Sequence, residues 1–195
     1  MRKLAALLLA AAAFAIAGCG NDENGAEGAE GEETTISGQA PFDRAFIDAM
    51  VPHHQAAIEM ARGAKQAGLS QPELISIAND IVATQQVEID QMLAWREQWF
   101  GSAEPGPQEA ALETLGLTPV EAGMEHGDVD LASVDDVDQT FAGMMIGHHV
   151  GAIRMAELAE TEADHDEMKE LAGEIITAQQ REIDVMEKHA SGEHG

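Results

Sequence analysis

Apolar residues recur with the 3.6-residue period of amphipathic helices in four long segments of this 195-residue chain. The first segment closes on Gly68, and the second opens with Ser70-Gln-Pro-Glu73, a capping-box sequence. The four predicted helices cover residues 41–67, 70–100, 135–162 and 164–189. Between residues 41 and 190 no segment alternates between apolar and polar positions as strands do, so we expect an all-α fold.

The four helices form two copies of one repeat. Residues 46–61 align with residues 141–156 at eight identical positions out of 16, and each copy contains an adjacent pair of histidines. Residues 78–92 align with residues 172–186 at eight identical positions out of 15. Each repeat is therefore a helical hairpin, and the chain predicts a four-helix bundle in which two duplicated hairpins pack face to face.

A connector rich in Gly, Pro and Asp joins the two hairpins at residues 101–134. Thr118-Pro-Val-Glu121 has the sequence of a capping box, which predicts a short helix from that point. Met124 and His126 follow in the same connector, and we consider both as candidates for additional metal ligands.

Helical periodicity turns the duplicated histidines inward. On the first helix, Asp48 falls on the polar face, whereas His53 and His54 flank the centre of the apolar stripe. The third helix repeats this arrangement with His148 and His149. Four inward histidines in two matched pairs are more typical of a metal site than of ordinary packing.

Two glutamates are also placed inward by the helical period. Glu88 on the second helix and Glu182 on the fourth lie on the apolar side, each preceded by a glutamine, Gln85 and Gln179. A buried carboxylate without a partner is very costly, so each glutamate needs a cation, a proton or a strong donor nearby. The inward histidines are the expected neighbours. We therefore predict a metal site that the histidines and glutamates share, with the two glutamines next to the ligands but not bound to the metal.

Methionines complete the predicted donor set. Imidazole binds zinc, copper, iron and nickel, whereas the soft thioether sulfur favours Cu(I). We therefore expect copper, with zinc, iron or manganese as alternatives. The predicted metal ligands are His53, His54, His148, His149, Met50, Met145, Met60, Met155, Glu88 and Glu182.

These residues are consistent with three functions. The donor set favours a metal-binding protein that stores, buffers or delivers copper over an enzyme. A ferritin-like di-metal oxidoreductase would need a Glu from two helices and Glu-x-x-His from the other two. The only such sequence, Glu162 to His165, falls at a predicted turn. A metal-free helical interaction module, whose polar core sets the helix register, is the third alternative.

The N-terminal segment has the pattern of a secretory signal. Arg2 and Lys3 precede an apolar run over residues 4–17, which is too short to span a membrane. The run ends in Ala17-Gly18-Cys19, which is similar to the lipobox of bacterial lipoproteins. We therefore expect residues 1–18 to be removed and Cys19 to carry lipid, so that an extracytoplasmic protein contacts the membrane through this anchor only.

Acidic residues dominate the composition. The chain has 36 Asp and Glu against 10 Lys and Arg, a formal net charge of −26. This excludes nucleic acid as a partner, because phosphate binding needs Lys and Arg. Residues 19–40 are rich in Gly and Glu and predict a disordered tether, residues 41–190 the bundle, and residues 191–195 a flexible tail.

These motifs resemble a bacterial family of unknown function, numbered 305. Its hallmark is a duplicated Met-x-x-His-His-x-x-Ala-Ile-x-Met-Ala helix, each copy followed by a Gln-x-x-Glu-Ile-x-x-Met helix. Residues 50–61 and 85–92 match this pattern, as do residues 145–156 and 179–186. The resemblance implies a secreted or lipid-anchored ferritin-like bundle, and some members are linked to extracytoplasmic copper binding and resistance.

Overall fold

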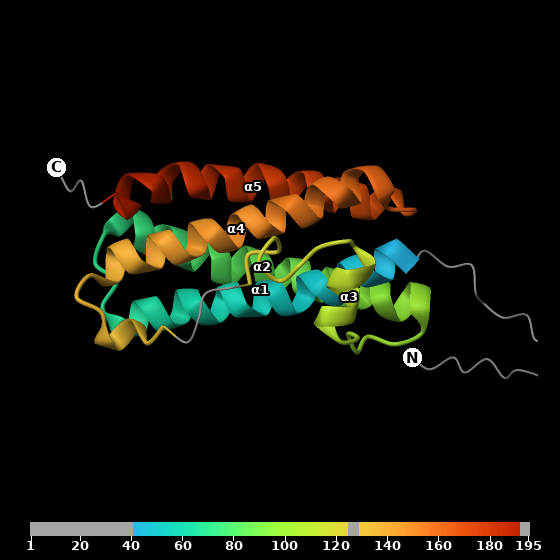
Figure 1. Ribbon diagram of the computed structural model, residues 1–195, viewed down its shortest axis with the longest axis horizontal. Coiled ribbons are helices and arrows are strands. Elements are labelled where there is room, and N and C mark those ends of the chain that lie inside the picture. Colours follow the sequence, from blue (N-terminus) through green and yellow to red (C-terminus); the bar gives the residue numbers. More distant parts are fainter. Residues whose placement is uncertain (1–40, 125–128, 192–195) are drawn as a thin grey trace, which may run out of the picture. The chain divides into compact units, whose positions relative to one another are not determined.

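The computed structural model describes residues 41–124 and 129–191, which form a bundle of four long helices (Figure 1). The long helices are α1 (Pro41–Ala67), α2 (Pro72–Phe100), α4 (Val137–Glu162) and α5 (Asp166–Ala190). A short helix, α3 (Gln108–Thr114), and a 3₁₀ turn, η1 (Leu131–Ser133), lie between α2 and α4 in the chain. No strand occurs among the described residues, and the predicted all-α fold is confirmed.

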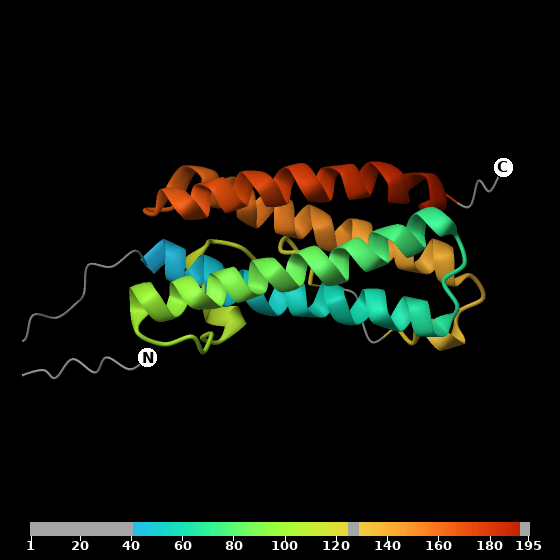
Figure 2. The same ribbon diagram turned by 180° about the vertical axis from the view of Figure 1, so that it is seen from behind.

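The helices pair as two hairpins, α1 with α2 and α4 with α5. The hairpins meet where α1 packs against α4 and α2 against α5, as the two opposite views show (Figures 1 and 2). This confirms the predicted bundle of two duplicated hairpins. None of the helices in the described part of the chain is long and apolar enough to cross a membrane.

Two equivalent aspartates fasten the hairpins to each other. Asp43, near the start of α1, accepts hydrogen bonds of 2.9 and 3.0 Å from the backbone N–H groups of residues 164–165, just before α5. Asp138, the aligned residue of α4, accepts bonds of 2.9 Å from the N–H groups of residues 70–71, just before α2. Each hairpin thus binds the residues that precede the second helix of the other, and the negative charge suits a helix N-terminus.

The capping box predicted at Ser70–Glu73 is therefore wrong. The Ser70 hydroxyl donates to Asp138 Oδ2 at 2.6 Å, and Glu73 instead lies 2.9 Å from His189 Nε2 of α5. Gln71 occupies the N-cap position of α2 without a capping bond from its side chain. Asp138 of the other hairpin thus accepts the bond from the Ser70 N–H that Glu73 would accept in a capping box.

The short helix predicted at Thr118–Glu121 is also wrong. The two residues do make the reciprocal bonds of a capping box: the Thr118 N–H donates to Glu121 Oε2 at 3.0 Å and the Glu121 N–H to Thr118 Oγ1 at 3.3 Å. The bonds from the backbone and hydroxyl of Thr118 hold the pKa of Glu121 below its usual range. They close only a turn over residues 118–124, and the connector's helix is α3.

Helix α3 covers the outer face of α1, where Ala111 and Leu112 pack in the same apolar cluster as Ala45. Asp48, which the helical wheel places on the polar face, is only 6% exposed, and a Cβ atom on Gly106 of the connector would lie 2.7 Å from its Oδ2. Its carboxylate accepts a bond of 2.5 Å from Arg96 Nε of α2. The wheel of α1 alone failed here because the covering residues belong to the connector.

Candidate metal centre

The four histidines of the duplicated motif lie in the middle of the bundle, where none is more than 1% exposed. His53 of α1 and His148 of α4 face each other across the interface of the hairpins, with ring centroids 3.6 Å apart and an interplanar angle of 36°. The rings of His54 and His149 lie 6.4 Å from those of the adjacent histidines. The two repeats therefore meet at their histidine pairs.

His54 and His149 each bond a glutamate of their own hairpin. His54 Nε2 lies 2.7 Å from Glu88 Oε2, and His149 Nε2 lies 2.6 Å from Glu182 Oε2. The two carboxylate side chains are 17% and 16% exposed. An ionised carboxylate only accepts, so each Nε2 carries the hydrogen, and in the neutral form of the imidazole the lone pair is then on Nδ1.

The Nδ1 atoms of His54 and His149 are buried and have no hydrogen-bond partner within the described residues. Leaving a buried polar atom unsatisfied costs roughly 1–3 kcal/mol, and here both repeats keep the same arrangement. An imidazole whose other nitrogen donates to a carboxylate is the usual form of a metal-ligating histidine. The donor chemistry at these two atoms therefore fits a transition-metal ion.

The connector reaches the centre through one backbone group. His53 Nε2 donates to the carbonyl oxygen of Ala122 at 2.9 Å. Ala122 belongs to the turn of residues 118–124, and Figure 1 shows the yellow connector crossing the junction of α4 and α1. Because a carbonyl oxygen only accepts, Nε2 of His53 carries a hydrogen.

Glycines allow this turn to approach α4 closely. A Cβ atom on Gly151 would lie 2.1 Å from the carbonyl carbon and oxygen of Ala122. Gly123 has a φ of +67°, and its Cβ would lie 2.5 Å from the carbonyl oxygen of Gly147. This contact was not predicted from the sequence, although one signal was present: residue 151 is Gly where the other repeat has Ala56.

The predicted methionines do not share one environment. Met50, Met145 and Met155 are fully buried. Met60, the repeat equivalent of Met155, is half-buried and lines a groove at the surface together with Met144. The structure thus separates Met60 from the buried methionines that the repeat alignment groups it with.

The two connector candidates fare differently. Met124 is half-buried, and its sulfur accepts a bond from Gln108 Nε2 at 3.7 Å. Gln108 also donates to the carbonyl oxygen of Ala49 in α1, so this contact ties the connector to the bundle. His126 lies outside the described residues, as does Cys19.

The polar donors form pairs rather than a single cluster. Across residues 41–124 and 129–191, no three His, Cys, Asp or Glu side chains gather closely enough to hold a metal ion. Gln85 and Gln179, which precede the two glutamates in the sequence, are buried. Their Oε1 atoms have no hydrogen-bond partner among the described residues. A metal held by the histidines would therefore need a donor of another type. The thioether sulfur atoms of Met50 and Met145 are soft donors, and they lie one helical turn before His54 and His149.

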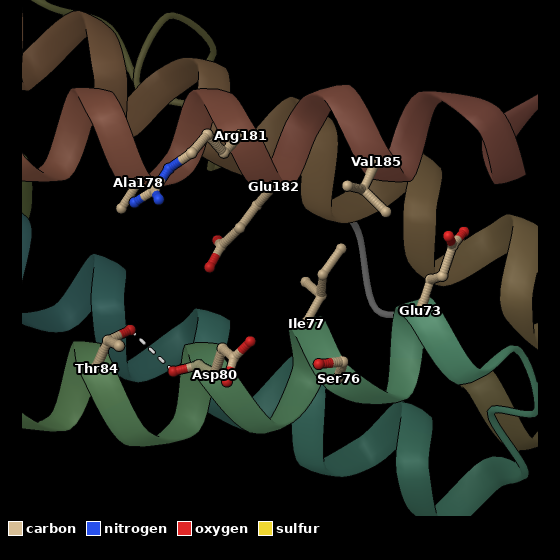
Figure 3. A pocket seen from close by; sticks show the side chains of 9 residues that line it. All are labelled: Glu73, Ser76, Ile77, Asp80, Thr84, Ala178, Arg181, Glu182 and Val185. Carbon is tan, nitrogen blue, oxygen red and sulfur yellow. Dashed lines mark hydrogen bonds between the residues drawn. The ribbon is translucent and has the colours of Figure 1, made fainter.

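A groove of about 460 Å³ lies between α2 and α5, and Glu182 is one of the residues that line it (Figure 3). Figure 3 shows Glu182 pointing from α5 into the groove, with Asp80 and Thr84 on α2 across from it. Because Glu182 also bonds the buried His149, this side chain links the groove to one histidine of the centre.

Comparison with known proteins gives a consistent picture. The model of DUF305, a domain of unknown function, matches residues 22–96 and 43–190. The structure of CopM in its Cu(I)-bound form is 32% identical, covers 78% of this chain and 98% of CopM, and has a TM-score of 0.62. CopM in its Cu(II)-bound form is 35% identical, covers 78% of this chain and 97% of CopM, and has a TM-score of 0.64.

A further relative is a DUF305 fragment from Deinococcus radiodurans, whose crystal structure is 27% identical. It covers 78% of this chain and 98% of the fragment, with a TM-score of 0.60. A search among curated proteins found no match.

Proposed function

The chain belongs to the DUF305 family, and we propose that it binds Cu(I) at the centre of its bundle in order to store, buffer or deliver this ion. The observation that carries the proposal is the hydrogen bonding of His54 and His149. Both keep a buried Nδ1 without a partner among the described residues, while a glutamate holds the opposite nitrogen. Such an imidazole is oriented and made more basic for metal ligation.

The proposed centre has two equivalent halves. In one half, Nδ1 of His54 and the sulfur of Met50 are ligands; in the other, Nδ1 of His149 and the sulfur of Met145 take these roles. Glu88 and Glu182 act through their histidines, because their bonds to Nε2 orient the rings. The rings of His53 and His148, with centroids 3.6 Å apart, lie between the halves.

The choice of copper rests on two arguments. Buried thioethers favour Cu(I) over the harder divalent ions, and all four histidines can bind it. CopM, of which the chain covers nearly the whole length at 32–35% identity, has been solved with Cu(I), Cu(II) and silver. A monovalent cation would also offset part of the negative charge of the two half-buried carboxylates.

The proposal extends to location. The apolar run at residues 4–17 followed by Ala17-Gly18-Cys19 supports a lipid anchor on Cys19 and hence an extracytoplasmic role. The formal net charge of −26 attracts cations from solution towards such a protein.

Metal analysis of the protein isolated from its native envelope, followed by anaerobic titration with Cu(I) against a chelator of known affinity, tests this function. We expect copper in the isolated protein, and we expect the His54→Gln/His149→Gln variant to bind Cu(I) far more weakly. His165→Gln is the matched control, because His165 lies at one end of the bundle, bonded to Asp43. Absence of copper together with unchanged Cu(I) affinity in the first variant would refute the proposal, and redox turnover by the loaded protein would favour the oxidoreductase.

A further inference from the structure

A second groove, of about 570 Å³, lies between α1, α4 and η1 and is lined by none of the four histidines. Its polar lining consists of Glu59 and Gln66 of α1 and Asp130 beside η1. Two methionines, Met60 of α1 and Met144 of α4, line it from neighbouring helices. The groove thus presents thioethers and carboxylates to solvent.

The exposure of these two methionines sets them apart from most others in the bundle. The fully buried methionines are Met50, Met92, Met145, Met155, Met168 and Met186. Met60 and Met144 are instead half-buried, packed on one side against the apolar cluster that contains Phe141 and open on the other side to the groove. Both side chains are therefore held in place by packing on one side and accessible from solution on the other.

The groove does not belong to the duplicated centre. The residue aligned with Met60 in the other repeat is Met155, which is fully buried. The residue aligned with Met144 is Ala49, which is buried in the cluster that includes α3. Two thioethers at one groove therefore occur here on one side of a bundle whose two halves are otherwise matched.

The charge of the groove suits a cation. Glu59 and Asp130 contribute carboxylates, and the lining residues include neither Lys nor Arg. One oxygen of Asp130 accepts a bond of 3.0 Å from the Ala132 N–H, which fixes this carboxylate beside the groove. A pair of thioethers selects soft ions, and nearby carboxylates raise the local concentration of cations without selecting among them.

We propose that this groove is a second binding site, open to solvent, for a soft monovalent cation such as Cu(I) or Ag(I), with the sulfur atoms of Met60 and Met144 as ligands. The site goes beyond the proposed function, because it shares no residue with the histidine centre. It assigns Met60 to a site separate from the buried one that its sequence repeat suggests.

Titration of the ¹³C-methyl-methionine-labelled protein with Ag(I), a diamagnetic soft cation, tests the proposal by NMR. Met60→Leu and Met144→Leu assign the two ε-methyl resonances and nearly preserve the side-chain volumes. We expect both resonances to shift together in the wild type, and each single variant to lower the affinity at the groove at least about tenfold, since losing a mere supporting residue already costs roughly 10–100-fold. Met168→Leu, at a fully buried position, is the matched control and should leave the titration unchanged.

The same spectra separate this inference from the proposed function. Shifts at the histidine ring resonances with unmoved Met60 and Met144 methyls would overturn the groove site and leave the centre intact. Shifts at the two methyls with unmoved histidines would support the groove and count against the centre. A shift of only one of the two methyls, or equal shifts on addition of Zn(II), would overturn the two-thioether site.

Discussion

The imidazole rings of His53 and His148 lie 3.6 Å apart, centroid to centroid, although 95 residues separate them in the chain. They are the same position of the two repeats, so this contact marks where the repeats meet. His54 and His149 then each turn to a glutamate of their own hairpin. Because the halves are equivalent, a change in one of them should remove only part of the metal binding, and variants are best tested in pairs.

Replacing both glutamates by glutamine, Glu88→Gln with Glu182→Gln, should lower the affinity for Cu(I) by roughly 10–100-fold. The amide keeps the shape and an oxygen that accepts the Nε2 hydrogen, but it removes the charge that makes the imidazole more basic. Metal-free stability should change by less than about 1.5 kcal/mol, because a neutral hydrogen bond remains and a partly buried charge is relieved.

Competitive Cu(I) titration and urea unfolding of the apo protein measure these two quantities. Val87→Gln is the control. Residue 87 is 63% exposed, so this substitution adds a glutamine next to Glu88 in the chain but on the surface. Unchanged affinity for every metal tried would show that the two carboxylates have only a structural role.

The double change Met50→Leu/Met145→Leu should weaken Cu(I) binding much more than Zn(II) binding. Leucine is close to methionine in volume, so the buried positions should lose less than about 1.5 kcal/mol of stability. The loss of thioether sulfur removes the soft donor that distinguishes the two ions. Parallel Cu(I) and Zn(II) titrations measure the ratio, and an equal loss for both ions would rule out thioether ligation at these positions.

Gly151→Ala should destabilise the protein by about 1–3 kcal/mol, because the new methyl group would overlap the backbone of Ala122. The displaced turn should also lose its bond to His53. Gly143→Ala is the matched control on the same helix, since a Cβ there meets nothing within 4 Å. That change should stabilise the helix by up to about 1 kcal/mol. Urea unfolding of both variants measures the two effects, and a change of stability in the same direction for both would contradict this prediction.

Ala178→Trp should slow the loading of Cu(I) on the order of tenfold while leaving the equilibrium affinity nearly unchanged. Ala178 lines the groove into which Glu182 points, so a bulky side chain there would obstruct the entry of ions through this groove (Figure 3). Ala83→Trp on the exposed face of α2 is the control. Stopped-flow loading rates that do not differ between the two variants would mean that the ion enters by another route.

Intact-mass analysis of the mature protein should find a diacylglyceryl group on Cys19, and the protein should partition with membranes. Cys19→Ser should leave the protein unprocessed or in the soluble fraction, because the acyl chains supply the membrane affinity. A mature protein with an unmodified Cys19 would contradict the predicted anchor.

Much of the architecture follows from the sequence alone. The periodicity of α1 predicts its span of residues 41–67, and the structure agrees. The duplication predicts two hairpins, and the helical wheel turns Glu88 and Glu182 towards the histidines that they bond. These inferences succeed because they need only the geometry within one helix and the rule that a buried carboxylate requires a partner.

Other features were decided by the tertiary structure. Asp48 is buried beside Gly106 of the connector and Arg96 of α2, and Asp138 binds the residues just before α2 from the other hairpin. Met60 and Met155 occupy the same position in the two repeats, yet one lines a groove and the other is fully buried. The helical period determines which face of a helix a residue occupies, whereas the segment that packs against that face is set by contacts between distant parts of the chain, which no local pattern contains.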